Sequence, residues 1–234
     1  MRRIGFSTGA IARGDFHSAL AIMQQHNLDV VELSALRVGE LRPLVEAIPG
    51  LDLTGFHFVS IHAPSRFAPD EEADVLGLLR PLADRGFHIV VHPDTIFNAT
   101  RWRLLGDRLL IENMDKRKPI GRTAMELREF FVALPEARFC FDIGHARQVD
   151  PSMTEAALLL NAFHDRLAEV HMSEVNTASR HDPLSTNAVM AFRSIMAAIP
   201  EDVPIILETL IDQGQSDIQT EIHRVNEVFG AVAA

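Results

Sequence analysis

The stretch Phe139-Cys140-Phe141-Asp142-Ile143-Gly144-His145 joins a short run of aromatic and apolar residues to an aspartate and a histidine. Short runs that are rich in β-branched and aromatic residues are typical of buried β-strands. Seven further runs of this kind occur at regular intervals along the chain. The eight predicted strands are residues 4–8, 30–34, 58–63, 88–92, 109–114, 139–145, 169–174 and 204–209.

Segments with helical periodicity separate these strands, among them residues 16–26, 71–85, 125–133, 154–165 and 189–198. A regular alternation of strands and helices is typical of parallel strands that are joined by crossover helices. Eight such repeats within 234 residues favour a closed (β/α)8 barrel, the TIM barrel, over an open doubly wound sheet. No linker-like or low-complexity tract divides the chain, so we expect residues 1–234 to form a single α/β domain.

The charge of the chain argues against several classes of partner. The formal net charge is -10, and only two lysines occur, Lys116 and Lys118, which disfavours binding to nucleic acid or to an anionic membrane. No stretch approaches the roughly 18 uninterrupted apolar residues that a membrane-spanning helix needs. The single cysteine, Cys140, cannot form an internal disulfide, and the first residues lack the apolar run of a signal peptide. We therefore expect a cytoplasmic protein.

Polar side chains stand at the carboxyl ends of six consecutive predicted strands. In a parallel barrel these ends surround the mouth, where the loops build the active site. Because alternate side chains of a strand point to the same face, these terminal polar residues can line one cavity. The residues at these ends are His62, His92, Glu112, Asp142, His145, His171 and Glu208.

This convergence predicts a bound metal ion. A barrel interior is mainly filled by branched apolar side chains, so carboxylates and imidazoles there are costly unless a cation or hydrogen bonds compensate them. Imidazole and carboxylate ligands suit Zn²⁺, Mn²⁺, Fe²⁺ and Co²⁺, and the ligand types do not separate these ions. The other histidines at strand starts or on helical stretches are interpreted as structural or solvent-facing: His17, His26, His57, His88, His164 and His223.

At these residues the chain resembles the xylose isomerase-like barrel superfamily, which includes the ketose 3-epimerases and endonuclease IV. The resemblance spans nearly the whole chain. It rests on the motifs Ile111-Glu112-Asn113-Met114, Phe141-Asp142-Ile143-Gly144-His145, His171-Met172-Ser173-Glu174 and Leu207-Glu208-Thr209. In the epimerases, the positions that match Glu112, Asp142, His171 and Glu208 hold one divalent metal ion, and the two glutamates also move protons. The resemblance implies the same roles here, and a substrate contact for His145.

Endonuclease IV holds three zinc ions with nine ligands, and this chain is similar to it at eight of these positions. The resemblance to that branch adds these implied metal ligands: His62, His92, His145 and His181. One position differs, because Ser179 stands where that family has an aspartate, two residues before His181. Serine is a poor metal ligand, and whether Asp182 replaces the aspartate stays open. The resemblance therefore implies between one and three metal ions.

Two enzymatic hypotheses follow from these residues. The first is isomerisation or epimerisation of a small sugar, sugar phosphate or related hydroxy-carbonyl compound through an enediolate, with Glu112 and Glu208 moving the proton. The second is hydrolysis of a phosphate ester, nucleic acid included, at a multi-metal site to which His62 and His92 contribute. The epimerase-like His-x-Ser-Glu motif, the serine at position 179 and the acidic composition favour the first. A non-catalytic binding module on the same barrel is a third alternative.

The substrate of either enzyme would contact further residues at the mouth. The candidates are His145, Glu32, Glu174 and Arg180. For Glu32, a helix cap or a surface salt bridge is an equally good interpretation. The segment 101–122 is locally basic and either contacts phosphates or forms a solvated face, of which the solvated face is favoured.

Three apolar residues near these segments are interpreted as structural. Trp102 and Phe67 either cover the mouth or pack the loops, and packing is favoured. Cys140 is expected to be a small buried barrel residue, because nothing near it in the sequence would activate a thiolate. The sequence leaves the oligomeric state open, a homo-oligomer included.

Overall fold

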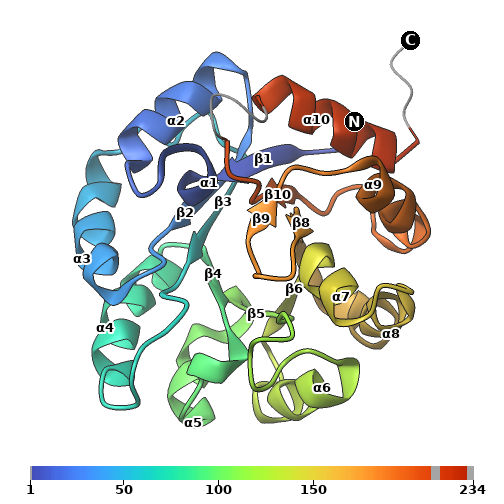
Figure 1. Cartoon of the computed structure of the whole chain (residues 1–234). Helices are drawn as coiled ribbons and strands as arrows, with labels where there is room; N and C mark the ends of the chain where they lie inside the picture. The colour runs from blue at the N-terminus through green and yellow to red at the C-terminus, as the bar shows by residue number, and fades with distance from the viewer. Residues whose placement is uncertain (1, 212–216, 231–234) are drawn as a thin grey trace.

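The computed structural model of the protein describes residues 2–211 and 217–230. Eight parallel strands close into a barrel in the order β1-β10-β7-β6-β5-β4-β3-β2, and helices surround it as an outer ring (Figure 1). The predicted (β/α)8 TIM barrel is therefore confirmed. The barrel strands are β1 (Ile4–Ser7), β2 (Val30–Ser34), β3 (Phe58–His62), β4 (His88–Val91), β5 (Leu109–Glu112), β6 (Arg138–Asp142), β7 (Leu167–Met172) and β10 (Ile205–Leu207).

The helices of the outer ring turn their apolar faces toward the strands. In α4, for example, the buried residues Val75, Leu79 and Leu82 recur at helical spacing. No helix in the described ranges is both long and apolar enough to cross a bilayer. The helices are α1 (Thr8–Ala12), α2 (Phe16–Gln25), α3 (Val38–Ala47), α4 (Glu72–Asp84), α5 (Ala99–Trp102), α6 (Ala124–Ala133), α7 (Ile143–Val149), α8 (Thr154–Phe163), α9 (Thr186–Arg193) and α10 (Ile218–Val228).

Seven of the eight predicted strands end one to three residues earlier than the sequence pattern suggested. The run 139–145 stops being a strand at Asp142, because the Asp142 side chain accepts a hydrogen bond from the backbone N–H of His145 and caps helix α7. The run 169–174 ends at Met172. Glu174 instead begins a two-stranded antiparallel hairpin, formed by β8 (Glu174–Val175) and β9 (His181–Asp182). This β8–β9 hairpin lies over the barrel in the view of Figure 1.

One predicted helix begins earlier than expected. The segment 189–198 is preceded by a helical turn that starts at Thr186, because the side chain of Ser185 accepts a hydrogen bond from the N–H of Ala188 and caps α9. The helix then ends at Arg193, and a short 3₁₀ turn follows it over residues 196–198. The other predicted helices agree with α2, α4, α6 and α8 to within a few residues.

Four buried residues of the barrel strands form a small apolar cluster that is separate from the main hydrophobic core: Val90, Leu110, Cys140 and Ala168. Cys140 is fully buried, and burial raises the pKa of its thiol well above the usual value, in agreement with the predicted inert role. The next inward-facing residues along β4, β5 and β6 are His92, Glu112 and Asp142. Alternation along the strands thus carries polar side chains into the upper barrel, as predicted.

Gly5 on β1 lies directly against the backbone of β2. A Cβ atom at this position would overlap the backbone carbonyl oxygen of Val30 on β2. Backbone atoms of a closed barrel cannot move away as a flexible side chain end can, so position 5 requires glycine.

We expect Gly5→Ala to destabilise the fold by about 1–3 kcal/mol, the usual cost of overpacking a core. The measurement is urea unfolding followed by circular dichroism. The matched control is Gly77→Ala in α4, where nothing lies within 4 Å of the new Cβ and where alanine should stabilise the helix by about 0.5–1 kcal/mol. Equal stability of wild type and Gly5→Ala would contradict the close approach of β1 and β2.

Candidate metal centre

The polar side chains that were predicted to share one cavity meet at the carboxyl end of the barrel. A cavity of about 380 Å³ opens there. Its lining includes six of the eight predicted metal ligands: His62, His92, Glu112, His145, His181 and Glu208. The other two, Asp142 and His171, are fully buried next to it. Four of the eight predicted ligands lie on barrel strands, namely His62, Glu112, Asp142 and His171. The other four lie in the segments that follow barrel strands, namely His92, His145, His181 and Glu208.

The carboxylate of Glu112 lies between four imidazoles. Its Oε1 atom is 3.2 Å from Nδ1 of His145 and 3.7 Å from Nδ1 of His171. Its Oε2 atom is 3.3 Å from Nε2 of His62 and 3.3 Å from Nε2 of His92. The two oxygens therefore face two different sets of side chains.

The first set consists of Glu112, Asp142, His171 and Glu208, whose potential ligand atoms all lie within 4.8 Å of one another. Three of these residues have a buried polar atom without a hydrogen-bond partner, namely Asp142 Oδ2, His171 Nδ1 and Glu208 Oε2. Buried polar atoms are normally satisfied, and leaving one without a partner costs free energy. Three such atoms in one ligand set fit a divalent cation, which would compensate the buried charges of the set.

The second set consists of His62, His92 and Glu112, whose potential ligand atoms also lie within 4.8 Å of one another. Nδ1 of His62 is 2.8 Å from the carbonyl oxygen of Ala63. A carbonyl oxygen can only accept, so Nδ1 carries a proton and Nε2 faces the Glu112 carboxylate. Burial alone would lower the pKa of His62, but Glu32 and Glu112 raise it to about 9. In this second set, either a proton on His62 or a bound cation can compensate the negative charge of Glu112.

Asn113 fixes the position of Asp142 and was not singled out as a functional residue from the sequence. Its Nδ2 donates to the backbone oxygen of Asp142 at 2.7 Å, and its Oδ1 accepts from the backbone N–H of Asp142 at 2.8 Å. The backbone oxygen of Asn113 is 3.0 Å from Nδ1 of His145. One buried amide thus holds the end of β6 and the start of α7 in register. An asparagine directly after Glu112 at a strand end was the available signal.

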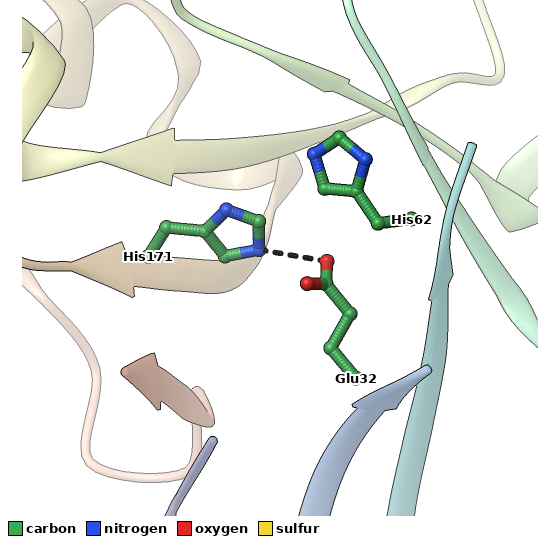
Figure 2. A group of neighbouring side chains, drawn as sticks. All are labelled: Glu32, His62 and His171. Atoms are coloured by element: carbon green, nitrogen blue, oxygen red, sulfur yellow. Dashed lines mark ion pairs between the residues drawn. The ribbon is translucent and has the colours of Figure 1, made fainter. Parts of the chain in front are cut away.

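Glu32 lies deeper in the barrel than predicted. It is the third residue of β2, is fully buried, and forms neither a helix cap nor a surface salt bridge. Its Oε2 atom is 3.2 Å from Nε2 of His171, as the dashed line in Figure 2 marks. Glu169, which was not predicted to have a role, approaches the same Nε2 atom at 3.3 Å. The signal for Glu169 was its position two residues before His171 on the same strand face.

The position that would complete a third metal site is taken up by local structure. His181 Nδ1 is 2.8 Å from Ser173 Oγ and 3.3 Å from Glu208 Oε2. Ser179 has a left-handed backbone, with φ of 51°, and its hydroxyl accepts from Gln148 Nε2 at 2.9 Å. Asp182 accepts from Asn176 at 2.8 Å and does not line the cavity. The Ser179 hydroxyl and one carboxylate oxygen of Asp182 are thus each engaged in a hydrogen bond with another residue.

The rim of the cavity carries positive charge. Arg117, Lys118 and Arg180 all line it. Lys118 Nζ is 2.9 Å from Asp94, and Arg117 Nε is 3.8 Å from Asp115. Within the described residues, the Arg180 side chain has no ion-pair partner.

Other candidates from the sequence lie away from the cavity. The carboxylate of Glu174 is held by Arg147 at 2.9 Å and by the N–H of Ser185 at 2.9 Å, and it does not line the cavity. Trp102 is fully buried and donates to Glu72 at 2.9 Å, and Phe67 packs against Phe97, in agreement with the predicted packing roles. In the basic segment 101–122, Arg101 and Arg122 form ion pairs outside the cavity.

The titratable groups of the site compensate one another. Burial would lower the pKa of His145, but Asp142 raises it to about 10. Burial would raise the pKa of Glu208, but His171 lowers it to about 2. Burial raises the pKa of Asp142 well above its usual value. Histidine and carboxylate ligands must lose their protons to bind a cation, so metal binding is expected to weaken as the pH falls.

Comparison with known proteins supports the fold. No family model matches the chain, and no curated protein matches it. A xylose isomerase-like TIM barrel protein from Mycobacterium smegmatis, in complex with magnesium, has a TM-score of 0.60 at 14% identity over 100% of this chain and 98% of that one. A candidate sugar phosphate isomerase/epimerase from Anabaena variabilis has a TM-score of 0.52 at 16% identity, over 90% of this chain and 84% of that one. SacUVDE has a TM-score of 0.53 at 15% identity, over 91% of this chain and 83% of that one. These matches show that the chain shares the TIM-barrel fold of these proteins.

We expect Asp142→Asn to remove the stabilisation that an added divalent ion gives. Asparagine still caps a helix, so the fold should persist in chelator, but a neutral amide is a much weaker ligand than a carboxylate. At a metal concentration about 100-fold above the dissociation constant, wild type should gain about 2.7 kcal/mol, seen as a higher melting temperature in Mn²⁺ or Zn²⁺.

The matched control is Asp94→Asn at the rim, because Asp94 pairs with Lys118 and lies outside both ligand sets. This variant should keep the full metal-dependent shift of the melting temperature. An Asp142→Asn variant that keeps the same shift would contradict the assignment of the first ligand set.

Proposed function

We propose that this protein is a divalent-metal-dependent isomerase or epimerase acting on a small sugar, sugar phosphate or related hydroxy-carbonyl compound. The observation that carries the proposal is the first ligand set, Glu112, Asp142, His171 and Glu208, with its three unpartnered buried atoms. The same residue types at matching strand ends form the single-metal site of the epimerases that the sequence resembles. Because the Mycobacterium smegmatis barrel was solved with magnesium, Mg²⁺ joins the ions to be tested.

The size and charge of the cavity support a small, oxygen-rich substrate. A volume of about 380 Å³ lies at the lower end of the range of roughly 300–1,000 Å³ that is typical of small-molecule sites. The carboxylates and imidazoles at its base suit hydroxyl and carbonyl groups. Arg180 on the rim, which has no ion-pair partner among the described residues, suits a phosphate or carboxylate group at the far end of the substrate.

The residues of the chain divide into proton carriers and substrate contacts. Glu208 lines the cavity with a side chain that is 13% exposed, so its carboxylate can reach a substrate C–H group. Glu112 also lines the cavity and would exchange the proton from the opposite side. A bound divalent cation would polarise the substrate carbonyl and lower the energy of the enediolate. His145 and Arg180 would orient the substrate, whereas Glu174 would support the β8–β9 hairpin through Arg147.

We expect Glu208→Gln to lower the turnover of the substrate that the wild-type protein converts by about 10²–10⁴-fold, because an amide can neither accept the proton nor bind the cation well. The assay is a panel of sugars, sugar phosphates and hydroxy acids, read by NMR as exchange of a substrate C–H proton with deuterated solvent. Glu126→Gln, which changes a surface ion pair with Arg122, is the matched control and should keep full activity. Unchanged exchange in Glu208→Gln would overturn its role as a proton carrier.

Phosphate ester hydrolysis is the second candidate function, and one observation favours it. His62 and His92 both place Nε2 3.3 Å from the same oxygen of Glu112. A site for one metal ion does not need these two histidines, whereas Glu112 could bridge two cations, as paired metal sites of phosphoesterases require. The incomplete third group around His181 and the net charge of -10 weigh against a nucleic acid substrate.

The two functions predict different effects of His92→Ala. In a multi-metal hydrolase this change should remove one metal equivalent and most of the turnover, whereas a one-metal isomerase should keep its metal content and lose little activity. Metal content per chain, measured by mass spectrometry on protein purified without chelator, is the first readout. One equivalent in both proteins supports the isomerase, and two or three equivalents that fall on mutation support the hydrolase. No metal, with no rebinding of added ions, would contradict both.

A further inference from the structure

A second polar layer lies directly below the metal-facing side chains, inside the barrel. Its members come from β2, β3 and β7 and are all fully buried: Glu32, Ser60, Glu169 and His171. The barrel strands also contribute the small apolar cluster of Val90, Leu110, Cys140 and Ala168. Two carboxylates at this depth are costly, and branched apolar residues are usual there. The proton-transfer roles proposed above do not use Glu32 or Glu169, so their presence requires a separate explanation.

His171 connects this layer to the first ligand set. Its Nδ1 atom faces upward, 3.6 Å from Glu208 and 3.7 Å from Glu112, and has no hydrogen-bond partner. Its Nε2 atom faces downward, with Glu169 Oε1 at 3.3 Å in hydrogen-bond geometry and Glu32 Oε2 at 3.2 Å. The two nitrogens of one ring thus face a potential cation and a pair of carboxylates.

A cation in the lower layer is the competing explanation, since Glu32, His62 and His171 also bring potential ligand atoms within 4.8 Å of one another (Figure 2). A cation there would need Nε2 of His171 as a ligand. That atom already forms the hydrogen bond with Glu169, and Nδ1 of His62 faces the carbonyl oxygen of Ala63 at 2.8 Å. Two carboxylate oxygens of the lower layer, Glu32 Oε2 and Glu169 Oε2, have no hydrogen-bond partner among the described residues, but a cation there would have to displace the proton that Nε2 of His171 donates to Glu169.

We propose that Glu169 and Glu32 are positioning residues that act on the metal through His171. A carboxylate that accepts the N–H of a metal-ligating histidine fixes its tautomer and ring orientation and makes its other nitrogen a better ligand. Glu169 accepts from Nε2 of His171, and the hydroxyl of Ser60 donates to the same Glu169 oxygen at 2.9 Å. Glu32 lies on the other side of the ring. The inference rests on the metal site of the proposed function but not on its substrate.

The test is the affinity of Glu169→Gln and Glu32→Gln for a single metal ion, Co²⁺ or Zn²⁺, titrated into the chelator-treated full-length protein. Each change keeps the side-chain shape and removes the charge, and each should raise the dissociation constant about 10- to 100-fold. Glu72→Gln is the matched control. Glu72 is an equally buried carboxylate that accepts hydrogen bonds from Trp102 and Phe97, far from His171, so this variant should bind metal as wild type does.

A second readout separates positioning from general support of the fold. In the Co²⁺ protein, the visible absorption bands report ligand geometry, and they should shift in Glu169→Gln and Glu32→Gln but not in Glu72→Gln. Should either glutamine variant fail to fold, Ser60→Ala loosens Glu169 without changing charge and should weaken metal binding in the same direction.

The outcomes distinguish this inference from the proposed function. Wild-type affinity and unchanged spectra in both glutamine variants would overturn the positioning role while leaving the metal site intact. An equal loss of affinity in Glu72→Gln would overturn it as well, because the effect would then come from general destabilisation. A wild-type protein that binds metal but isomerises nothing would contradict the proposed function, and weakened binding in the two variants would still support the positioning role.

Discussion

The interaction between the Glu112 carboxylate and its four surrounding imidazoles organises the whole upper half of the barrel. Each oxygen of Glu112 faces two histidines, and Glu112 itself is 1% exposed. An uncompensated carboxylate at this depth would be too costly to keep. The negative charge of Glu112 must therefore be compensated, either by protons on the histidines or by cations bound among them.

The barrel makes this arrangement possible because its geometry separates two kinds of contact. Outward-facing residues of the strands pack against the helices, whereas inward-facing residues on β3, β5, β6 and β7 converge on one axis. Asp142 has a local and a global role, since its carboxylate caps α7 through the N–H of His145 and also belongs to the first ligand set with His171 and Glu208. Asn113 then ties β5 to this turn. Little freedom is left for the ligands to move.

The sequence was informative where a local pattern determines the structure. Short β-rich runs at regular intervals identified all eight barrel strands, and the polar residues at six consecutive strand ends predicted that these side chains share one cavity, because parallel strands bring these ends together. The end of β6 was misplaced, since an aromatic run followed by Asp142 resembles a longer strand until the capping bond is known. The position of Glu32 was misread because its partner, His171, is distant in the sequence and lies on another strand of the barrel. Glu169 was missed although it lies only two residues before His171, because it does not stand at the strand end.

The structure also suggests why metal binding and substrate choice can vary separately in such a barrel. The first ligand set comes from strands or from residues directly after them, held by the closed sheet and by buried hydrogen bonds. The β8–β9 hairpin contributes Ser179, Arg180 and His181 to the cavity lining, and the segment after β5 contributes Arg117 and Lys118. Because Asn176 and Gln148 hold this hairpin by a few polar contacts, its sequence can change without disturbing the strands. Under the proposed function, the cation would be held by the barrel strands, and the substrate would be selected by the segments of the rim, of which the β8–β9 hairpin is one.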